Sequence, residues 1–474
     1  MLGRRWWLLL VVLVAVLGVV KAHIGGQTAS APPNIVLIQI DTLRQDHVGC
    51  YGYQRPTTPN LDRFARSGVT FRNAYSVTSW TLPAVTSLLT GLLPSRHGVR
   101  AIGDLLPPTI PSVARILHLN GYRTAAISAN FAFVNPGDAF PEGAPHLGQG
   151  FETFQVLWQQ ADPTDREAET IMGKLIRTVR ADGVTSKMAD FLRTTPEPFF
   201  LFTLQIDPHY GYEPPEGYRF FEPVALNSTV SGYLQDGIQL RDPLSPDDLQ
   251  HLVNLYDGEI RYADEMLGDF LASLDESGMA DRTVVIILAD HGEAFGEHGR
   301  MLHGQSLYDN TLRIPLMVRG PSIPAGVVVD GLVSITDIMP TVLELADLPP
   351  QSDLDGRSLA SAWRHPHGQN DRTLLFELDN ELELLNGPRL HSRAVREGDW
   401  KLIASLDGSR ELYNIAQDPG EINNLAATKP EIVSHLSAAL PGASELAPTP
   451  EARPTLGEAE KERLRALGYG TGSD

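Results

Sequence analysis

IVLIQI at residues 35–40, followed by Asp41, is the most informative stretch of this chain. A continuous run of large apolar residues of this length is typical of a strand buried on both faces of a parallel sheet. Further strand candidates alternate with stretches of helical periodicity; the strands span residues 124–128, 199–206, 283–289 and 314–318, and the helices span residues 59–67, 112–120 and 247–277. This alternation predicts an α/β fold with a large, mostly parallel sheet flanked by helices.

The pattern changes after about residue 365. Short strand-like segments at residues 393–396, 400–403 and 411–413 are separated by turns, and a helical stretch follows near residue 430. Such a pattern predicts a small antiparallel unit packed on the main one. We therefore divide the chain into a main domain at residues 34–365, a small C-terminal α+β subdomain at residues 366–445, and a Pro-rich stretch with a terminal helix at residues 446–474.

The N-terminus has the pattern of an export signal. Arg4 and Arg5 precede an apolar run at residues 6–20, which Lys21 ends. Residues 1–21 are therefore predicted to be a secretory signal peptide or an uncleaved membrane anchor, and residues 22–33 a linker. The positive flank would keep the N-terminus inside and send the rest outward. We expect an exported protein, periplasmic or extracellular, which residues 6–20 tether to the membrane if they are retained.

Composition and charge exclude some classes of function. The 474 residues carry a formal charge of −20, which argues against nucleic acid as a partner because phosphate backbones are bound by clustered Lys and Arg. An anionic substrate would need local positive charge from a metal ion, a histidine or an arginine. Cys50 is the only cysteine, so the chain has no disulfide framework and no thiolate zinc site. We expect Cys50 to be a buried packing residue.

Three of the predicted strands are followed by an acidic residue: Asp41, Asp207 and Asp290. Ligands of open α/β sheets bind outside the carboxyl ends of the strands, where carboxylates are good ligands for hard cations. A single aspartate in this position is most often a helix cap or a turn residue. Three at one sheet edge, two of them close to His209 or His291, favour a metal site.

A short apolar helix is predicted to begin near Thr81. Pro83 suits its first turn, and Gly91 suits its end. Free N–H groups and the helix dipole favour negative charge near Thr81. The hydroxyl becomes a nucleophile only if a neighbour, such as a divalent cation, lowers its pKa. On local sequence alone, a simple helix cap is an equal alternative.

The chain resembles the sulfatase family of the alkaline phosphatase superfamily over nearly all of residues 34–435. Six groups of motifs follow in the family's order. They are NIVLIQIDTLR at residues 34–44, TPNLD at 58–62, TLPAV at 81–85 with LLTG at 88–91 and PSRHG at 94–98, DHGE at 290–293 with GEHG at 296–299, RIPL at 313–316, and ELY at 411–413 with DPGE at 418–421. The resemblance implies a sulfatase-like fold, with residues 34–365 as the catalytic domain.

The resemblance also implies a catalytic site. One divalent metal ion would be held by Asp41, Thr81, Asp290 and His291, with Thr81 as the nucleophile. The substrate would be an anionic phosphate or sulfate ester.

Three further residues are implied as contacts of the substrate. His209 and His303 would be catalytic and would bind the substrate oxygens and the leaving group, and Arg44 would be a substrate contact or a support. Asp207 is either a ligand of a second metal ion, together with His209, or a structural residue.

Departures from the family pattern indicate which branch of the superfamily the chain resembles. Ordinary sulfatases carry a Cys or Ser, followed by x-Pro-x-Arg, that is oxidised to formylglycine; here the two positions are Thr81 and Val85. Threonine cannot become that aldehyde. The second acid after the first strand is replaced by Thr42, and His303 lies near the place of a missing lysine.

These traits resemble the threonine-dependent phosphodiesterases and the phosphoglycerol and phosphoethanolamine transferases. A mixed set of carboxylate, imidazole and hydroxyl ligands favours Zn²⁺ or Mn²⁺, with Ca²⁺ as the alternative. We therefore expect a metal-dependent phosphoester hydrolase or transferase. The alternatives are a sulfuric ester hydrolase that works without formylglycine and a catalytically degenerate binding protein.

Overall fold

The structure is a computed structural model that describes residues 31–100, 104–130, 147–160, 169–171, 174–219, 221, 244–367, 372–380, 390–405 and 407–440. The predicted signal segment at residues 1–21, most of the linker and the terminal stretch at residues 446–474 lie outside the described residues. In the part of the chain that is described, no helix combines the length and the apolar character that crossing a membrane requires.

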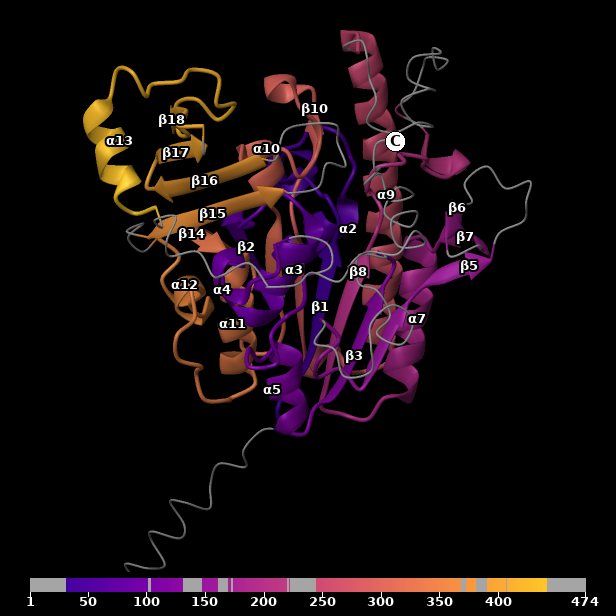
Figure 1. The fold of residues 1–474 in the computed structure, drawn as a ribbon. Coiled ribbons are helices and arrows are strands. Elements are labelled where there is room, and N and C mark those ends of the chain that lie inside the picture. Colours follow the sequence, from indigo (N-terminus) through magenta and orange to yellow (C-terminus); the bar gives the residue numbers. More distant parts are fainter. Residues whose placement is uncertain are drawn as a thin grey trace, which may run out of the picture. The chain divides into compact units, whose positions relative to one another are not determined.

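A nine-stranded sheet forms the centre of the main domain (Figure 1). Its order is β12-β2-β13-β9-β1-β8-β3-β4, and β14 pairs with β2. The neighbours β9, β1, β8, β3 and β4 all run parallel, whereas β12 and β13 are antiparallel to their neighbours. The prediction of a large, mostly parallel sheet is confirmed. The strands are β1 (Asn34–Ile40), β2 (Val69–Tyr75), β3 (Arg123–Ser128), β4 (Thr153–Val156), β8 (Phe199–Gln205), β9 (Thr283–Ala289), β12 (Arg313–Ile314), β13 (Leu316–Arg319) and β14 (Val327–Ser334).

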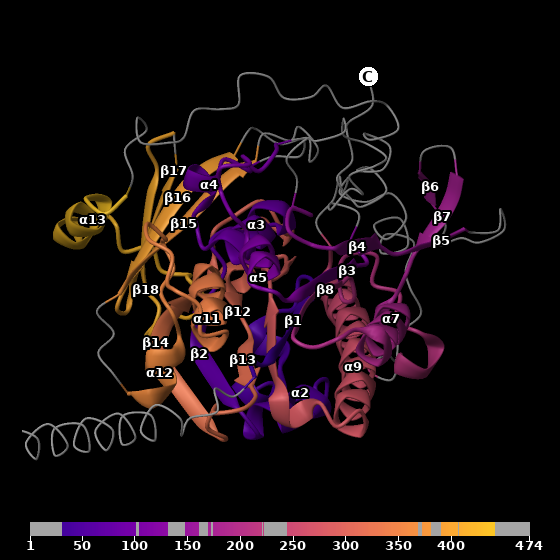
Figure 2. The ribbon, with the colours of Figure 1, turned by 90° about the horizontal axis from the view of Figure 1, so that it is seen from below.

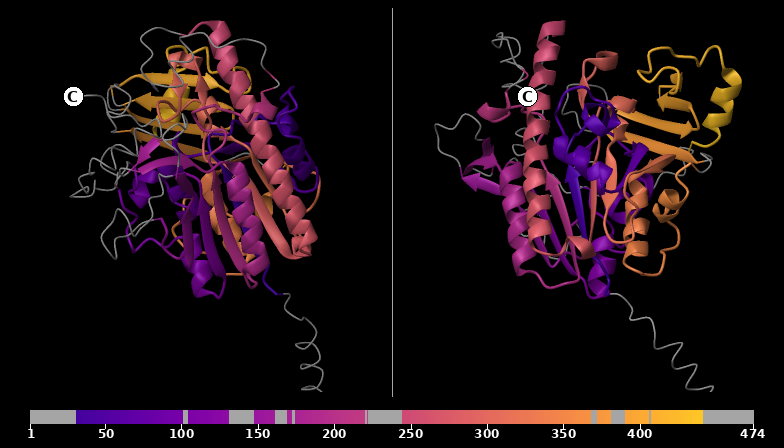
Figure 3. Two further views of the ribbon diagram at one scale, coloured as in Figure 1. Left: turned by 90° about the vertical axis from the view of Figure 1, so that its right-hand side faces the viewer. Right: turned by 180° about the vertical axis from the view of Figure 1, so that it is seen from behind.

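Helices cover both faces of the sheet. Strands β1, β8 and β9 are buried along their whole length, as their apolar sequences require. One face carries α2 (Pro59–Arg66), α7 (Ala181–Thr194) and the long α9 (Pro246–Glu276), and both α2 and α7 pack against α9 (Figure 3). The other carries α3 (Thr81–Thr90), α4 (Pro94–His97), α5 (Val113–Leu119), α11 (Ile338–Leu345) and α12 (Ala360–Arg364), as Figure 2 shows from below.

The C-terminal subdomain is a four-stranded antiparallel sheet with one helix, as predicted. Its strands lie in the order β15 (Thr373–Asn380), β16 (Leu390–Glu397), β17 (Trp400–Ser405) and β18 (Arg410–Asn414), and α13 (Pro430–Ser437) packs on β16 and β17.

A buried ion cluster joins this subdomain to the main domain. The Lys401 ammonium, fully buried on β17, lies 2.7 Å from Asp309 Oδ1 and 2.8 Å from Glu421 Oε1. Asp309 begins α10 (Asp309–Leu312), a turn of the main domain. The cluster therefore fixes α10 to the C-terminal sheet.

The remaining elements are short. They are the β10 (Ala294–Phe295) and β11 (Met301–Leu302) pair, a sheet of β5 (Trp158–Gln160), β7 (Lys174–Thr178) and β6 (Glu169–Ile171), and the 3-10 turns η1 (Gln45–His47), η2 (Gly49–Tyr51), η3 (Glu216–Tyr218), η4 (Ala280–Arg282), η5 (Glu297–Gly299) and η6 (Ile335–Asp337). Cys50 lies on η2 and is exposed, so the expectation that it packs in the core is wrong. None of the three residues of this 3-10 turn is buried, so the turn leaves the Cys50 side chain at the surface.

Candidate active site

The carboxyl ends of adjacent parallel strands bring the predicted metal ligands together. Ile40 of β1 is in register with Ala289 of β9, so the residues that follow them, Asp41 and Asp290, lie side by side at one sheet edge. Both carboxylates are fully buried, and so is His291. The ligand atoms that these three side chains offer lie within 4.8 Å of one another.

The orientation of His291 suits a metal ligand. Its Nδ1 lies 2.9 Å from the carbonyl oxygen of Gly292 and must carry the proton to donate there. The other nitrogen, Nε2, is thereby left with a free lone pair. It faces Asp290 Oδ2 at 3.4 Å, Asp41 Oδ1 at 3.7 Å and Thr81 Oγ1 at 3.2 Å. Four potential ligand atoms from three elements therefore converge.

The hydrogen bonds around the two carboxylates leave one oxygen of each free. Asp290 Oδ1 accepts from the backbone N–H groups of His291 and Thr42, and Asp41 Oδ2 accepts from Asn130 at 2.6 Å. Among the described residues, Asp41 Oδ1 and Asp290 Oδ2 have no hydrogen-bond partner.

Burial, followed by the nearby charge of Asp290, raises the pKa of Asp41 well above its usual value. Two buried carboxylates with one free oxygen each are costly unless a cation lies between them. The residues present therefore fit a divalent metal ion.

Thr81 lies where the sequence predicts it. It is the first residue of α3, it is fully buried, and the helix ends at Gly91 in the left-handed conformation. Extended backbone at Trp80 turns the chain into the helix, and the free N–H groups of the first turn lie next to the hydroxyl. A negative charge on or near Thr81 Oγ1 is therefore stabilised by the helix N-terminus.

His209 and His303 lie next to this cluster. The ring of His303 is 4.6 Å from that of His291 and 5.0 Å from that of His209, measured between ring centroids. The Nδ1 of His303 is 3.0 Å from Glu293 Oε1, and the Nδ1 of His209 is 3.3 Å from the carbonyl of Tyr210. Both Nε2 atoms are thereby directed away from these anchors.

Burial favours the neutral form of both histidines. Burial, with His303 as the second cause, lowers the pKa of His209 to about 3, and burial lowers the pKa of His303 well below its usual value. The Nε2 of His209 is buried and has no hydrogen-bond partner among the described residues. It is free to meet a substrate oxygen.

The Arg44 guanidinium is engaged by residues other than the predicted metal ligands and histidines. Its Nε and Nη2 donate to the two carboxylate oxygens of Asp46, and its Nη1 donates to the Glu293 carbonyl and to Glu297 Oε1. With these donors engaged, the geometry favours a support of the loop at residues 293–297, which was the alternative, over a substrate contact. Asp207 likewise accepts from Arg180 and from the N–H of Ala181 at the start of α7, which favours its structural alternative.

Sequence reasoning missed two contributors. Asn130 follows β3, two strands from β1, and its fully buried amide holds Asp41. Its position after a predicted strand was the available signal. Glu293 accepts a hydrogen bond from the Tyr212 hydroxyl at 2.9 Å and another from His303, so it orients a predicted catalytic ring.

This combination of sheet edge, paired carboxylates and helix-borne hydroxyl fits an ester hydrolase, and three of its side chains could hold a metal ion. Comparison with protein families identifies the family within this class of enzymes. Residues 33–348, more than half of the chain, match the family model described as Sulfatase, and the chain belongs to this family. Residues 296–444 match the model described as N-sulphoglucosamine sulphohydrolase, C-terminal.

Individual relatives agree with this assignment. The chain is 26% identical over 427 residues to the uncharacterised sulfatase YidJ of Escherichia coli, covering 83% of each protein. It is 27% identical over 420 residues to an ulvan-active sulfatase of Formosa agariphila, covering 85% of this chain and 79% of the relative.

Solved structures share the fold. The phosphonate monoester hydrolase of Agrobacterium radiobacter superposes with a TM-score of 0.70 at 23% identity, covering 86% of this chain and 94% of that one. A structure in complex with its substrate D-glucosamine-2-N,6-O-disulfate gives a TM-score of 0.70 at 20% identity, covering 86% and 97%.

Proposed function

We propose that this member of the sulfatase family is an exported hydrolase or transferase of phosphate esters with Thr81 as its nucleophile. The observation that carries the proposal is the position of the Thr81 hydroxyl, 3.2 Å from His291 Nε2 and at the N-terminus of α3. Threonine cannot be converted to the formylglycine aldehyde. A phosphate ester of threonine, in contrast, can be released by attack of water on phosphorus.

Asp41, Asp290, His291 and Thr81 would hold one divalent ion. Nitrogen, carboxylate and hydroxyl ligands together favour Zn²⁺ or Mn²⁺ over Ca²⁺. When bound, the ion supplies a Lewis acid that lowers the pKa of a coordinated hydroxyl.

The reaction would proceed in two displacements. Thr81 Oγ1 forms a bond to phosphorus while the bond from phosphorus to the leaving alcohol breaks, and the hydroxyl proton passes to the solvent. A water molecule, or an acceptor alcohol in a transfer, then attacks the phosphorus and releases Thr81. The α3 N-terminus stabilises the charge on the oxygens in both steps.

His209 and His303 would contact the substrate. Their Nε2 atoms face the site because Tyr210 and Glu293 hold the opposite nitrogens. A neutral imidazole becomes protonated more readily beside an anionic phosphate, because an opposite charge raises its pKa. One ring can then donate a proton to the departing alcohol oxygen, which balances the proton lost from Thr81.

The test compares aryl esters as substrates of purified, metal-loaded protein. We expect the aryl phosphodiester to be cleaved faster than the aryl sulfate, and Thr81→Ala to abolish the activity. Thr86→Ala is the matched control, because Thr86 lies on the same helix and its hydroxyl donates only to the Leu82 carbonyl. Rapid acid quench followed by mass spectrometry should find on Thr81 a phosphoryl group that still carries the ester group that did not leave. Unchanged activity of Thr81→Ala would refute the proposal.

A sulfuric ester hydrolase is the second candidate, and the names of the relatives favour it. Both curated relatives described above are sulfatases, and one structural neighbour is in complex with a sulfated sugar. The phosphonate monoester hydrolase among the neighbours favours the first candidate instead. A preference for the aryl sulfate in the same assay would decide for the second. A degenerate binding protein would cleave neither ester.

Export is proposed from the N-terminal sequence. Fractionation of producing cells should find the protein outside the cytoplasm, and N-terminal sequencing of the mature protein distinguishes a cleaved signal from a retained anchor. Protein that stays in the cytoplasm would contradict the export.

A further inference from the structure

The long helix α9 holds two loops of the candidate active site through buried side chains. Glu259 accepts a hydrogen bond from the backbone N–H of Glu213, in the loop after β8. Tyr256 forms two hydrogen bonds with the backbone of the loop after β1. The contacts of Tyr256 lead to a predicted metal ligand through a single residue, Thr42.

Thr42 directly follows the predicted metal ligand Asp41 and has a backbone conformation that is rare for threonine. Its φ is +55°, in the left-handed region. A β-branched residue is strongly disfavoured there because its side chain crowds the backbone. Thr42 is fully buried, and its hydroxyl has no hydrogen-bond partner among the described residues, so the side chain does not stabilise this conformation. Contacts of the backbone must therefore hold it.

This conformation serves the metal ligand Asp290. The N–H of Thr42 lies 3.3 Å from Asp290 Oδ1, which also accepts from the N–H of His291 at 3.0 Å. The two donors fix one oxygen of the carboxylate and leave Oδ2 for a cation. Relaxation of Thr42 to an ordinary conformation would reorient the peptide groups on either side of it. Asp290 would then be held by one donor instead of two.

The Tyr256 hydroxyl is the contact that holds Thr42. It donates to the Thr42 carbonyl oxygen at 2.7 Å and accepts from the N–H of Arg44 at 2.9 Å. One hydroxyl thereby bridges the two successive peptide groups that follow Thr42. Burial, the largest cause, raises the pKa of Tyr256 well above its usual value, so the hydroxyl keeps its proton and remains a donor.

The Tyr256 ring is itself fixed in place. It is fully buried and packs against the rings of Phe295, His47 and Tyr212, with centroid distances of 5.0, 5.1 and 5.8 Å. A ring held on several sides has little freedom to turn its hydroxyl away. The hydroxyl is therefore a rigid support for the loop after β1.

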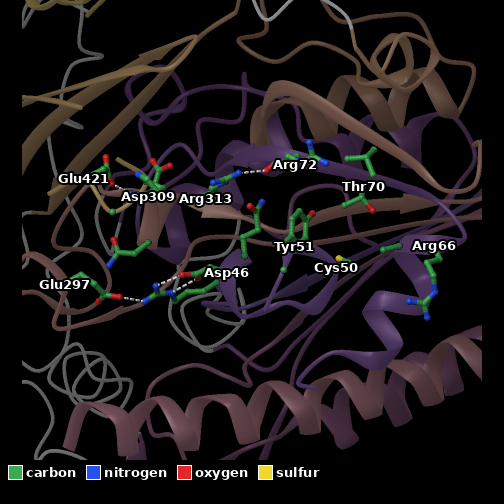
Figure 4. Close-up of a pocket in the computed structure, with 18 of the residues that line it drawn as sticks. Asp46, Cys50, Tyr51, Arg66, Thr70, Arg72, Glu297, Asp309, Arg313 and Glu421 are labelled. Atoms are coloured by element: carbon green, nitrogen blue, oxygen red, sulfur yellow. Dashed lines mark hydrogen bonds and ion pairs between the residues drawn. The ribbon is translucent and has the colours of Figure 1, made fainter. Parts of the chain in front are cut away.

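The Arg44 side chain ties the same loop to the one that begins at Asp290. Figure 4 shows Asp46 and Glu297 at one end of a surface groove, and both bind the Arg44 guanidinium, at 2.8 and 2.7 Å. Arg44 also donates to the Glu293 carbonyl. The loops after β1 and β9 therefore move as one unit, and Tyr256 connects this unit to α9.

We propose that Tyr256 is a positioning residue of the metal centre, whose hydroxyl holds Thr42 in the conformation that orients Asp290 toward the ion. Groups that orient metal ligands raise the affinity for the metal, because they exclude ligand arrangements that cannot bind it. The proposal rests on the metal centre of the proposed function. It is independent of whether Thr81 attacks a phosphate or a sulfate ester.

Direct binding of Mn²⁺ to chelator-treated protein tests the proposal without any substrate. Electron paramagnetic resonance detects the free ion and so gives the dissociation constant. Tyr256→Phe keeps the ring and removes only the hydroxyl, and we expect it to weaken Mn²⁺ binding about 10- to 100-fold.

Tyr262→Phe is the matched control. Tyr262 is a buried tyrosine of the same helix, and its hydroxyl accepts from the N–H of Asp182 in the first turn of α7, so the Mn²⁺ affinity should remain that of the parent. If the Tyr256 hydroxyl served stability alone, both variants would unfold at lower urea concentration and both would bind Mn²⁺ as the parent does. That result would overturn the proposal.

Thr42→Gly tests the route through Thr42. Glycine adopts a left-handed φ at little cost, so this change should restore part of the Mn²⁺ affinity that Tyr256→Phe loses. A double variant that binds Mn²⁺ no better than Tyr256→Phe would also overturn the proposal. A parent protein that binds neither Mn²⁺ nor Zn²⁺ would refute the metal centre itself, and this inference with it. A preference for the aryl sulfate would refute only the assignment of phosphate esters.

Discussion

Replacing Lys401 by methionine should destabilise the protein strongly. The methionine fills the space of the lysine stem but leaves Asp309 and Glu421 without the ammonium that lies 2.7 and 2.8 Å from them. Removing one partner of a buried ion pair costs about 3–5 kcal/mol because the remaining charge stays in a medium of low polarity. Arg396 lies 3.4 Å from Asp309 and offsets only part of this cost.

The loss should depend on pH. Burial, with repulsion from Asp309, raises the pKa of Glu421 to about 7 even though Lys401 opposes the rise. Without Lys401 the folded pKa climbs further, so Glu421 stays protonated and uncharged at pH 6 but must ionise in a buried place at higher pH. Between the unfolded and the folded pKa the native state holds more protons, so stability falls as pH rises. The destabilisation should be larger at pH 8.5 than at pH 6.

Urea unfolding monitored by tryptophan fluorescence measures the effect, since Trp400 is the immediate neighbour of Lys401 on β17. Lys187→Met is the control: Lys187 is exposed on α7, and its loss should change the free energy of unfolding by less than about 0.5 kcal/mol. The double variant with Glu421→Gln should recover part of the loss, because it removes the unpaired charge. If Lys401→Met unfolds at the same urea concentration as Lys187→Met at both pH values, the ion cluster contributes nothing and our reasoning is wrong.

Three further predictions concern the metal centre. Asn130→Ala should weaken metal binding by about 10- to 100-fold, because Asp41 loses the donor that orients it; a metal titration of activity that matches the parent would contradict this. Gly292→Ala should cost about 1–3 kcal/mol and most of the activity, because its methyl group would collide with the Asn310 carbonyl, whereas Gly217→Ala, with open space around it, should behave like the parent in thermal unfolding and in the assay. Dialysis against a chelator should abolish ester cleavage, and Mn²⁺ or Zn²⁺ should restore it better than Ca²⁺; the opposite order would count against our assignment of the ligand set.

The sequence predicted the centre of the fold well. The apolar runs of β1, β8 and β9 predict strands buried on both faces, and few other structures fit such runs. An aspartate directly after such a strand does not pack in the apolar core. Neighbouring parallel strands then bring Asp41 and Asp290 together without further information. Helix α3 was predicted from Pro83 and Gly91, which mark its first turn and its end.

The sequence did not predict the edge of the sheet or the contacts of single side chains. Strand β2 reads VTFRNAY, a mixture of apolar and polar residues without the continuous run that marks a central strand, because it lies near the edge. The acceptors of the Arg44 guanidinium include Glu293 and Glu297, about 250 residues away, and nothing local reveals that choice. Asn130 was missed for a similar reason: an amide after a strand has no charge to draw attention to it.

The order of the strands in space has a consequence for how the protein reaches its native state. Asn34 at the start of β1 forms hydrogen bonds to residues of β8 and β9 that are 165 and 249 positions further along the chain. During synthesis β1 therefore emerges before both of its neighbours, and it stays without β8 for 165 residues and without β9 for 249. Such distant pairing makes folding slow and leaves the strand open to aggregation. A producing cell will need chaperones to shield β1 during this interval, and a chain that stops before β9 will not fold.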